Sequence, residues 1–290
     1  MKKTTLQKHT KIANNIMYYI YKYIDTDINL TQLSQDMKIS KFHMHRIFKE
    51  EFEENIYECI KSIRLQKASN LLLTNKNSTI SEIAQMCGYS SQAAFIHVFK
   101  QKFHTTPKKW RITEYKNFSN EILKESTAAI KSIKNFSGLH PSIVKMPTQK
   151  VYYIRHKGYN RSIKQTWQKL QAWLFCNNIS DVQQLGIHHD NPTITPLNEC
   201  KYIACIAIKD THKNISLPSL NIPEGVYAKF SFSGEYGNIL QFMKWVYFEW
   251  LISSGYETTT NPSFVHYKKN HFLDENEVFD VEMFIPIKYV

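Results

Sequence analysis

The sequence repeats itself near its start, and this repeat constrains the fold more than any other feature. Residues 33–40 resemble residues 83–90 in pattern, and residues 46–52 match residues 97–103, with Phe-Lys-x-x-Phe in both copies. Each copy has the pattern of a short helix, a turn and a second helix. We therefore expect two helix-turn-helix units, joined by a long helix from about residue 55 to residue 73.

The 3.6-residue period divides each second helix into two faces. In residues 41–51, the residues expected to face inward are Met44, Ile47 and Phe48. In residues 91–103, they are Phe95, Val98, Phe99 and Phe103. The outward positions are mostly polar or basic, and a helix with such a stripe fits the major groove of DNA, where Arg can read guanine and Gln adenine. The alternative is an ordinary solvated face of a helix bundle. The residues expected to contact DNA are Lys41, Phe42, His45, Arg46, Lys49, Ser91, Gln92, Ala93, Ile96, His97 and Lys100.

The net charge of the chain also favours binding to DNA. The chain has 37 Lys and Arg residues against 25 Asp and Glu residues, a net charge of +12. Residues 1–115 hold 18 basic and 10 acidic residues, a surplus of +8, so the smaller part of the chain carries most of the excess. A basic segment favours a polyanionic partner because neutralising phosphates releases counterions. Charge alone does not establish a polyanionic partner, because many proteins are basic without one.

Composition excludes several other classes. Hydrophobic residues make up 42% of the chain, enough for a buried core. The most apolar stretch, residues 245–252, is far shorter than the roughly 20 residues that cross a bilayer. The start of the chain lacks the apolar region of a signal peptide, and the five cysteines form no C-x-x-C pair. We expect a soluble, cytoplasmic chain with reduced thiols and no membrane partner.

The second half of the chain has a different sequence pattern. From about residue 147, short β-rich runs alternate with helical segments and turns. Gly158-Tyr159 is echoed by Gly234-Glu235-Tyr236 at a spacing near 77, and each copy has the pattern of a strand, a Gly turn, a helix and two strands. The predicted fold class is therefore multidomain, with an all-α double helix-turn-helix domain followed by an α+β domain of two pseudo-repeated strand-helix-strand-strand units.

Two such copies side by side would place aromatic side chains between them. Aromatic walls with few polar groups suit a planar or cationic small molecule, through stacking and cation–π attraction. The alternative is that these aromatics form the core that holds the helices on the sheet. The candidate effector-binding residues are Tyr159, Trp167, Tyr227, Tyr236, Trp245 and Tyr267.

The first half resembles the DNA-binding domain of AraC/XylS transcription regulators. The resemblance covers roughly residues 10–111 and rests on motifs in order: residues 30–34, 40–49, 64–68 and 83–89, then Phe99-Lys100-x-x-Phe103 and Thr106-Pro107 through Trp110-Arg111. It implies seven helices, with two recognition helices that enter successive major-groove segments. It matches Phe42, His45 and Arg46, and residues 92–94, 96 and 97, to contacting positions. His97 stands where the family usually has Arg, so the target sequence does not carry over.

The second half resembles the GyrI-like effector-binding domain, in the arrangement of Rob-like regulators. The matching pieces are residues 153–159, 185–192, 222–227, 234–236 and 247–251. The family commonly has a Glu two positions before the Tyr that precedes its last loop, and this acid pairs with cationic ligands. The matching residue here is Val265, so we add Val265 to the effector-site candidates and expect a neutral or anionic effector.

Other chemistry has weaker support. Some relatives of this domain are hydrolases with a Glu–Tyr pair; Val265 argues against that chemistry, although Glu235, Glu249 or Glu282 could substitute. Catalytic residues and cofactors are therefore not expected. No metal site is expected either, because adjacent residues such as His188 and His189 point to opposite faces of a strand.

The sequence thus predicts an AraC-type DNA-binding domain in residues 1–111, a linker in residues 112–145 and a GyrI-like domain in residues 146–290. The predicted function is a sequence-specific transcription regulator, an activator that works beside RNA polymerase on double-stranded DNA and senses a small molecule or a partner. The alternative is a small-molecule-binding or hydrolytic protein whose helical half mediates assembly.

Overall fold

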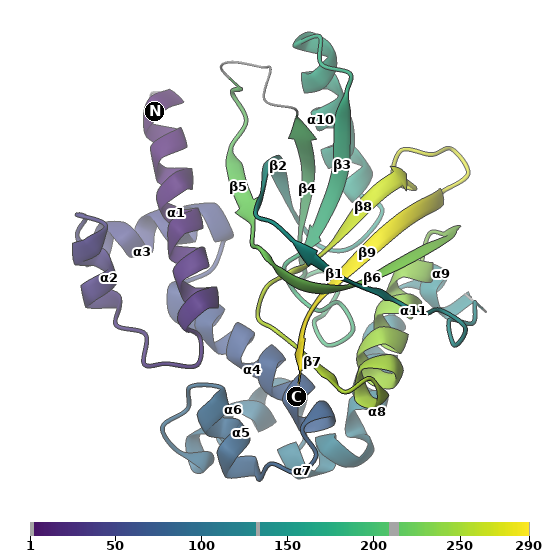
Figure 1. Cartoon of the computed structure of the whole chain (residues 1–290). Helices are drawn as coiled ribbons and strands as arrows, with labels where there is room; N and C mark the ends of the chain where they lie inside the picture. The colour runs from purple at the N-terminus through teal and green to yellow at the C-terminus, as the bar shows by residue number, and fades with distance from the viewer. Residues whose placement is uncertain (1–2, 132–133, 209–214, 290) are drawn as a thin grey trace. The chain divides into compact units, whose positions relative to one another are not determined.

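A computed structural model describes residues 3–131, 134–208 and 215–289 (Figure 1). The chain divides into two compact units, Met1–Arg111 and Ile112–Val290. In the described residues, none of the helices combines the length and the apolar character that a membrane span needs.

The first unit is all helical, as predicted. Its described part contains seven helices: α1 (Lys3–Tyr23), α2 (Leu30–Asp36), α3 (Lys41–Phe52), α4 (Ile56–Thr74), α5 (Ile80–Met86), α6 (Gln92–Phe103) and α7 (Pro107–Lys109). The π-helical turn η1 (Trp110–Glu114) follows. The pairs α2–α3 and α5–α6 are the two predicted helix-turn-helix units, and α4 is the long helix that joins them.

The two units begin and end their second helices in the same way. The hydroxyl of Ser40 accepts from the backbone N–H of His43, and the hydroxyl of Ser91 accepts from that of Ala94, so each serine satisfies a donor that the helix leaves unpaired. Both helices end at a residue in the left-handed region, Glu53 and His104. These equivalent caps, 51 residues apart, explain why the repeat in sequence becomes a repeat in structure.

Apolar side chains from both second helices form the core of this unit. Ile47 and Phe48 of α3 lie with residues of α1 and α4 in one buried cluster. In the second copy, Phe99 and Phe103 of α6 contact Trp110, with ring centroids 5.7 and 4.5 Å apart. Each such fully buried side chain contributes about 1.5–3 kcal/mol to folding.

Arg64, in the middle of α4, ties the two copies together. It donates from Nε to the carbonyl of Ile24, at 3.0 Å, and from Nη2 to that of Thr26, at 2.7 Å, in the segment before the first copy. Its guanidinium also lies over the ring of Tyr89, in the turn of the second copy. A Cβ on Gly88 would come within 2.8 Å of both Arg64 and the Ile24 carbonyl, so this turn requires glycine.

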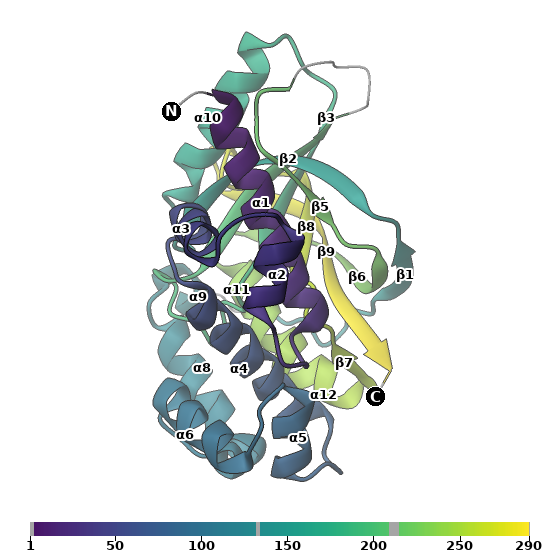
Figure 2. The ribbon, with the colours of Figure 1, turned by 90° about the vertical axis from the view of Figure 1, so that its left-hand side faces the viewer.

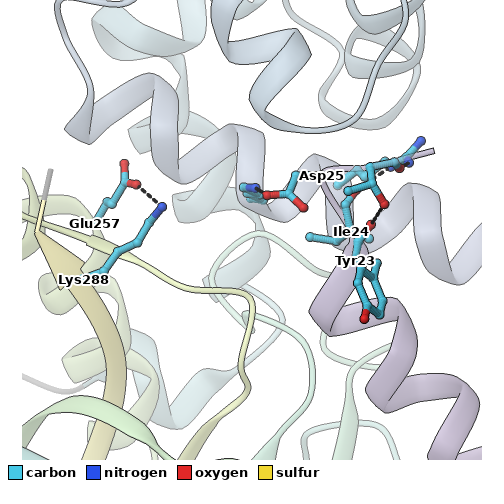
Figure 3. A network of polar contacts seen from close by, with 8 residues as sticks. Tyr23, Ile24, Asp25, Glu257 and Lys288 are labelled. Atoms are coloured by element: carbon cyan, nitrogen blue, oxygen red, sulfur yellow. Dashed lines mark hydrogen bonds and ion pairs between the residues drawn. The ribbon is translucent and has the colours of Figure 1, made fainter. Parts of the chain in front are cut away.

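The second unit is built on one antiparallel sheet. Its strands are β1 (Ser142–Met146), β2 (Gln149–Lys157), β3 (Val182–His188), β4 (Lys201–Ile208), β5 (Ser219–Ile222), β6 (Gly225–Glu235), β8 (Ser263–Lys269) and β9 (Val278–Tyr289), and the short β7 (Tyr256–Thr258) pairs with β9. The order is β1-β6-β9-β8-β3-β4-β2-β5. Buried Glu257 of β7 and Lys288 of β9 form an ion pair at 2.8 Å (Figure 3).

The predicted internal repeat of this unit is confirmed. The first copy consists of β2, α10 (Ile163–Cys176), β3 and β4. The second consists of β6, a helix formed by α11 (Asn238–Trp245), η2 (Val246–Trp250) and α12 (Leu251–Ser253), then β8 and β9. The two copies meet where β3 pairs with β8, at the centre of the sheet.

The two faces of the sheet are buried differently. Helix α10 contacts β2 and β4, and α11 contacts β6, so the helices cover one face. The opposite face carries a cluster that includes Val151, Leu185 and Phe264. In Figure 2, α10 lies on one side of the central strands and β1 on the other.

The segment 112–145, expected to be a linker, lies within the second unit instead. It forms α8 (Tyr115–Leu123), α9 (Thr127–Lys131) and β1, which pairs with β6. The physical reason is burial: Tyr115 packs on Phe248 and Phe136 on Phe242, and Gln241 of α11 donates to the Ala129 carbonyl.

The left-handed turn positions yield a stability prediction. Gly88 has φ +75°, and Lys38 occupies the equivalent position of the first copy with φ 54°. We expect Gly88→Ala to lower the free energy of unfolding by about 1–3 kcal/mol, because alanine is strained there and its Cβ clashes. Lys38→Gly should leave that free energy unchanged or raise it. Urea denaturation followed by circular dichroism measures both, and equal stability of Gly88→Ala and wild type would contradict the prediction.

Candidate functional site

Helix α3 presents its predicted stripe to solvent. Lys41, Phe42, Arg46 and Lys49 are exposed and His45 is half-buried. Phe42 is 81% exposed, although it is a large aromatic residue at the start of the helix. The opposite face is buried as expected, with Met44, Ile47 and Phe48 in the core.

Arg46 is held by weak contacts along its own helix. Its Nη2 lies 3.1 Å from His43 Nδ1, and its Nε lies 3.9 Å from the carboxylate of Glu50. Both side chains of the ion pair are about half exposed, so the pair stabilises the helix little, and the guanidinium can exchange it for a bidentate contact to guanine.

His45 stacks on the exposed ring of Tyr57, with centroids 5.5 Å apart. Burial, and then the charge of Lys41, lower the pKa of His45 below its ordinary value. The imidazole is therefore neutral near pH 7, and it can accept or donate a hydrogen bond without contributing to the positive charge.

Helix α6 presents a matching stripe. Gln92, Ala93, His97 and Lys100 are exposed, and Ile96 is half-buried. His97 Nε2 lies 3.0 Å from the amide nitrogen of Gln101.

Ser91 is exposed, but its hydroxyl already accepts the capping hydrogen bond. It can still donate its proton to a phosphate. With a shift of 51 residues, Arg46 corresponds to His97 and Lys49 to Lys100.

Contacts to α4 and to the turn that follows it hold the second copy in place. Trp110 Nε1 donates to the carbonyl of Ser69 at 3.2 Å. Arg111 donates to the carbonyls of Leu72, at 3.2 Å, and Ser78, at 2.8 Å. Reasoning from the sequence used Arg64, Trp110 and Arg111 only as motif residues, and their positioning roles depend on backbone carbonyls that no pattern reveals.

In the second unit, several predicted effector residues come together on the helix-covered face of the sheet. Trp167 of α10 packs perpendicular to Tyr267 of β8, with centroids 5.7 Å apart. Val265 is fully buried two residues earlier on the same face. Tyr159 lies in the loop after β2, and Tyr236 lies at the half-buried edge of the group.

The structure adds four residues that were not among the predicted effector residues. Tyr202 of β4 lies at the centre, because its hydroxyl is 3.0 Å from that of Tyr267 and accepts from Trp167 Nε1 at 3.3 Å. His188 contacts Tyr159, with centroids 5.2 Å apart. We call the whole group the tyrosine–histidine cluster: Tyr159, Trp167, His188, Tyr202, Tyr236, Tyr267, His271 and Phe272.

Two predicted effector residues lie elsewhere. Tyr227 belongs to the opposite face of the sheet, where it packs on Phe264 and donates to the carbonyl of Pro223. Trp245 packs against Phe136 and Phe230 in the second copy. Because strand residues alternate between faces, membership of the cluster depends on which face the helices cover.

The polar atoms of the cluster are deeply buried. Within the described residues, no hydrogen-bond partner reaches Tyr159 Oη, His188 Nε2 or His271 Nδ1. Burial lowers the pKa of His188 to about 4 and that of His271 to about 3, and it raises the pKa of Tyr159 well above its usual range. Both imidazoles are therefore neutral near pH 7.

Metal ligation has no geometric support in the described part of the chain. It contains no group of three or more His, Cys, Asp or Glu side chains placed to hold an ion.

Comparison with known proteins assigns both units. A family model described as a GyrI-like small molecule binding domain matches residues 139–288, and one described as a helix-turn-helix domain matches residues 33–112.

Relatives match the first unit. The chain is 37% identical over 107 residues to the xylose operon regulatory protein of Escherichia coli (strain K12), covering 37% of this chain and 26% of that protein. It thus spans about a quarter of that relative's length. It is 35% identical over 106 residues to the probable transcription factor PqrA of Proteus vulgaris, covering 34% of this chain and 86% of that protein. Among solved structures, the C-terminal domain of AraT, a response regulator from Geobacillus stearothermophilus, is 28% identical with a TM-score of 0.34, covering 35% of this chain and 84% of that one.

The buried histidines predict acid sensitivity of the second unit. The pKa of His266, on the opposite face of the sheet, is also lowered by burial to about 4. Because the unfolded histidine titrates near pH 6.5, the unfolded chain binds more protons between pH 6.5 and 4, and stability falls as pH falls through this window. Each such histidine contributes a slope of up to about 1.4 kcal/mol per pH unit.

Urea unfolding between pH 7 and 5.5 tests this prediction. The variant His266→Phe should show a smaller loss of stability over that range than wild type, while His140→Asn, at an exposed position, should show the wild-type loss. Identical pH dependence of His266→Phe and wild type would refute the assignment.

Proposed function

Since the chain belongs to the AraC/XylS family of transcription regulators and carries a GyrI-like small-molecule-binding domain, we propose that it activates transcription by docking both of its helix-turn-helix units on one DNA duplex. In this proposal the second unit senses a small molecule and RNA polymerase is the partner at the promoter. The chain acts as a regulator and carries out no catalysis of its own.

One observation carries the DNA-docking proposal: α3 and α6 expose equivalent stripes. Each is the second helix of its unit, each begins at a serine cap, and each buries its aromatic face in the core. A helix of this kind lies in the major groove with its first residues at the base edges. Two such helices in one chain can read two groove segments about 34 Å apart without a second subunit.

The exposed residues of α3 and α6 are suited to different parts of the DNA. Arg46 is suited to guanine and Gln92 to adenine, because both side chains make bidentate contacts. Phe42 and Ala93 offer apolar contact to thymine methyl groups. Lys41, Lys49 and Lys100 are suited to phosphates, which position the protein without reading sequence. His97, in place of the usual Arg, makes the second readout weaker.

The sensing role rests on the tyrosine–histidine cluster, which takes residues from both copies of the repeat. Aromatic surface with a few convergent polar groups is the usual lining of a small-molecule site. A hydrolytic role is less well supported. Glu282 is the half-buried candidate acid, and it lies beside Lys229 and Lys268 at 3.4 and 3.5 Å, next to His266 on the face opposite the cluster.

Substitution of Arg46 tests the recognition helix. We expect Arg46→Ala to weaken specific binding by about 1–3 kcal/mol, the typical contribution of a good bidentate base contact. Mobility shift with an operator found by genome-wide footprinting measures the loss. Lys22→Ala removes the same charge from an exposed position on α1 and should bind nearly as wild type. Wild-type affinity of Arg46→Ala would show that α3 does not read the bases.

Salt dependence tests phosphate docking. We expect the logarithm of the binding constant to fall linearly with the logarithm of salt concentration, because each neutralised phosphate releases counterions. Lys49→Ala and Lys100→Ala should each reduce the slope by about one. Titrations at low and moderate salt measure it, and a constant affinity would exclude docking on the DNA backbone.

A further inference from the structure

Three polar groups in the tyrosine–histidine cluster point to the chemistry of its ligand. Tyr159, His188 and His271 are each less than 6% exposed. Within the described residues, Tyr159 Oη, His188 Nε2 and His271 Nδ1 have no hydrogen-bond partner. An unsatisfied buried polar group costs about 1–3 kcal/mol, so three in one cluster indicate a site that a ligand completes.

These groups lie close together. The ring of Tyr159 is 5.2 Å from that of His188, and the ring of Phe272 is 6.5 Å from that of Tyr159 and 4.0 Å from that of His271. His188 and His271 interact electrostatically, because His188 lowers the pKa of His271. The three groups come from the loop after β2, the end of β3 and the loop after β8, so both copies of the repeat supply them.

The surroundings of these groups disfavour a cation. Val265, where the family usually has an acid, is fully buried and apolar. The titratable neighbours of these groups inside the cluster are the phenols of the other tyrosines. Two further titratable residues lie beside the cluster: Cys200 is near Tyr159, and His156 of β2 is opposite Tyr202.

The charged groups lie at the rim. Arg161 forms a bidentate ion pair with Glu277 at 2.7 Å, and its guanidinium covers the ring of Tyr236 at 4.4 Å. Glu277 is also influenced by Lys164 and acts on His271. Asp190 accepts from the backbone of Lys201 and acts on His189.

We propose that the tyrosine–histidine cluster binds a planar aromatic acid, whose carboxylate accepts hydrogen bonds from Tyr159 Oη and from the ring nitrogens of His188 and His271. This inference rests on the proposed sensing function and names the class of its effector. The aromatic part of the ligand stacks among Trp167, Tyr236 and Phe272. A buried carboxylate needs a compensating charge, so one of the two imidazoles takes up a proton as the acid binds.

Proton uptake gives the proposal a quantitative signature. The free imidazoles are neutral near pH 7, and the bound carboxylate stabilises the imidazolium. The association constant for the acid should therefore rise about tenfold for each pH unit between pH 8 and 6, because one proton enters with each ligand. A neutral ligand of the same shape should bind with little dependence on pH.

Three matched probes separate the charge classes: 2-naphthoate, 2-naphthamide and 2-naphthamidine. They are added to the full chain and followed by calorimetry in two buffers of different ionisation enthalpy, which counts the protons taken up. We expect 2-naphthoate to bind tightest, with uptake of one proton, and 2-naphthamidine to bind at least tenfold more weakly.

Variants place the probe in the cluster. Tyr159→Phe removes only the unpartnered hydroxyl, so it should keep or raise the stability of the fold while weakening 2-naphthoate at least tenfold. A merely structural role would change stability and affinity in the same direction. Replacing both imidazoles, in the double variant His188→Phe/His271→Phe, should abolish proton uptake, and His266→Phe, a matched change on the opposite face, should leave binding unchanged. Val265→Glu should reverse the preference toward 2-naphthamidine.

The outcomes separate this inference from the function on which it rests. Tightest binding of 2-naphthamidine, weakened by Tyr159→Phe, would keep the sensing function and overturn the acid. Binding of 2-naphthoate that is unaffected by both Tyr159→Phe and His188→Phe would overturn the assignment to the cluster. If none of the three probes binds, sensing of aromatic molecules by this cluster fails, and the acid fails with it.

Discussion

The guanidinium of Arg64 is the contact on which the helical unit depends most. From the middle of α4 it donates to two carbonyls of the segment before the first helix-turn-helix and lies over Tyr89 in the turn of the second. Trp110 and Arg111 complete the arrangement by donating to the carbonyls of Ser69 and Leu72 at the far end of the same helix, and Arg111 also donates to that of Ser78 in the turn before α5. A helix is stiff over this length, so α4 fixes the spacing of α3 and α6, while α3 and α6 supply the exposed side chains and part of the core.

The faces of α3 and α6 could be predicted because a helix obeys one period along its whole length. Met44, Phe48, Phe95 and Phe99 face inward for that reason alone. The cluster in the second unit could be predicted only in part. Tyr159, Trp167 and Tyr267 were predicted as aromatic residues between the two copies of the repeat, whereas the position of Tyr227 depends on which face of the sheet the helices cover. Which face the helices cover follows from the pairing of β3 with β8, a contact between residues about 80 positions apart.

Sequence reasoning did not identify His188, His271 and Tyr202 as members of the cluster, because each resembles another kind of residue. His188 and His271 look like surface or metal-binding residues in a sequence, because histidine is seldom buried without a partner. Tyr202 looks like an ordinary strand residue. Its ring packs directly over Gly186 on the neighbouring strand, where any side chain would collide with it. A glycine inside a strand is a usable signal for such a close approach, and it could have directed attention to this part of the sheet.

Helices α8 and α9 are held by contacts to the second helical segment of the sheet unit. Lys244 of α11 donates to Asn120, Gln241 to the carbonyl of Ala129, and Phe248 of η2 packs on Tyr115. Residues 115–131 are therefore part of the second unit, which begins at Ile112. A substitution that loosens α11 should therefore also loosen residues 115–131, because the two segments share these contacts.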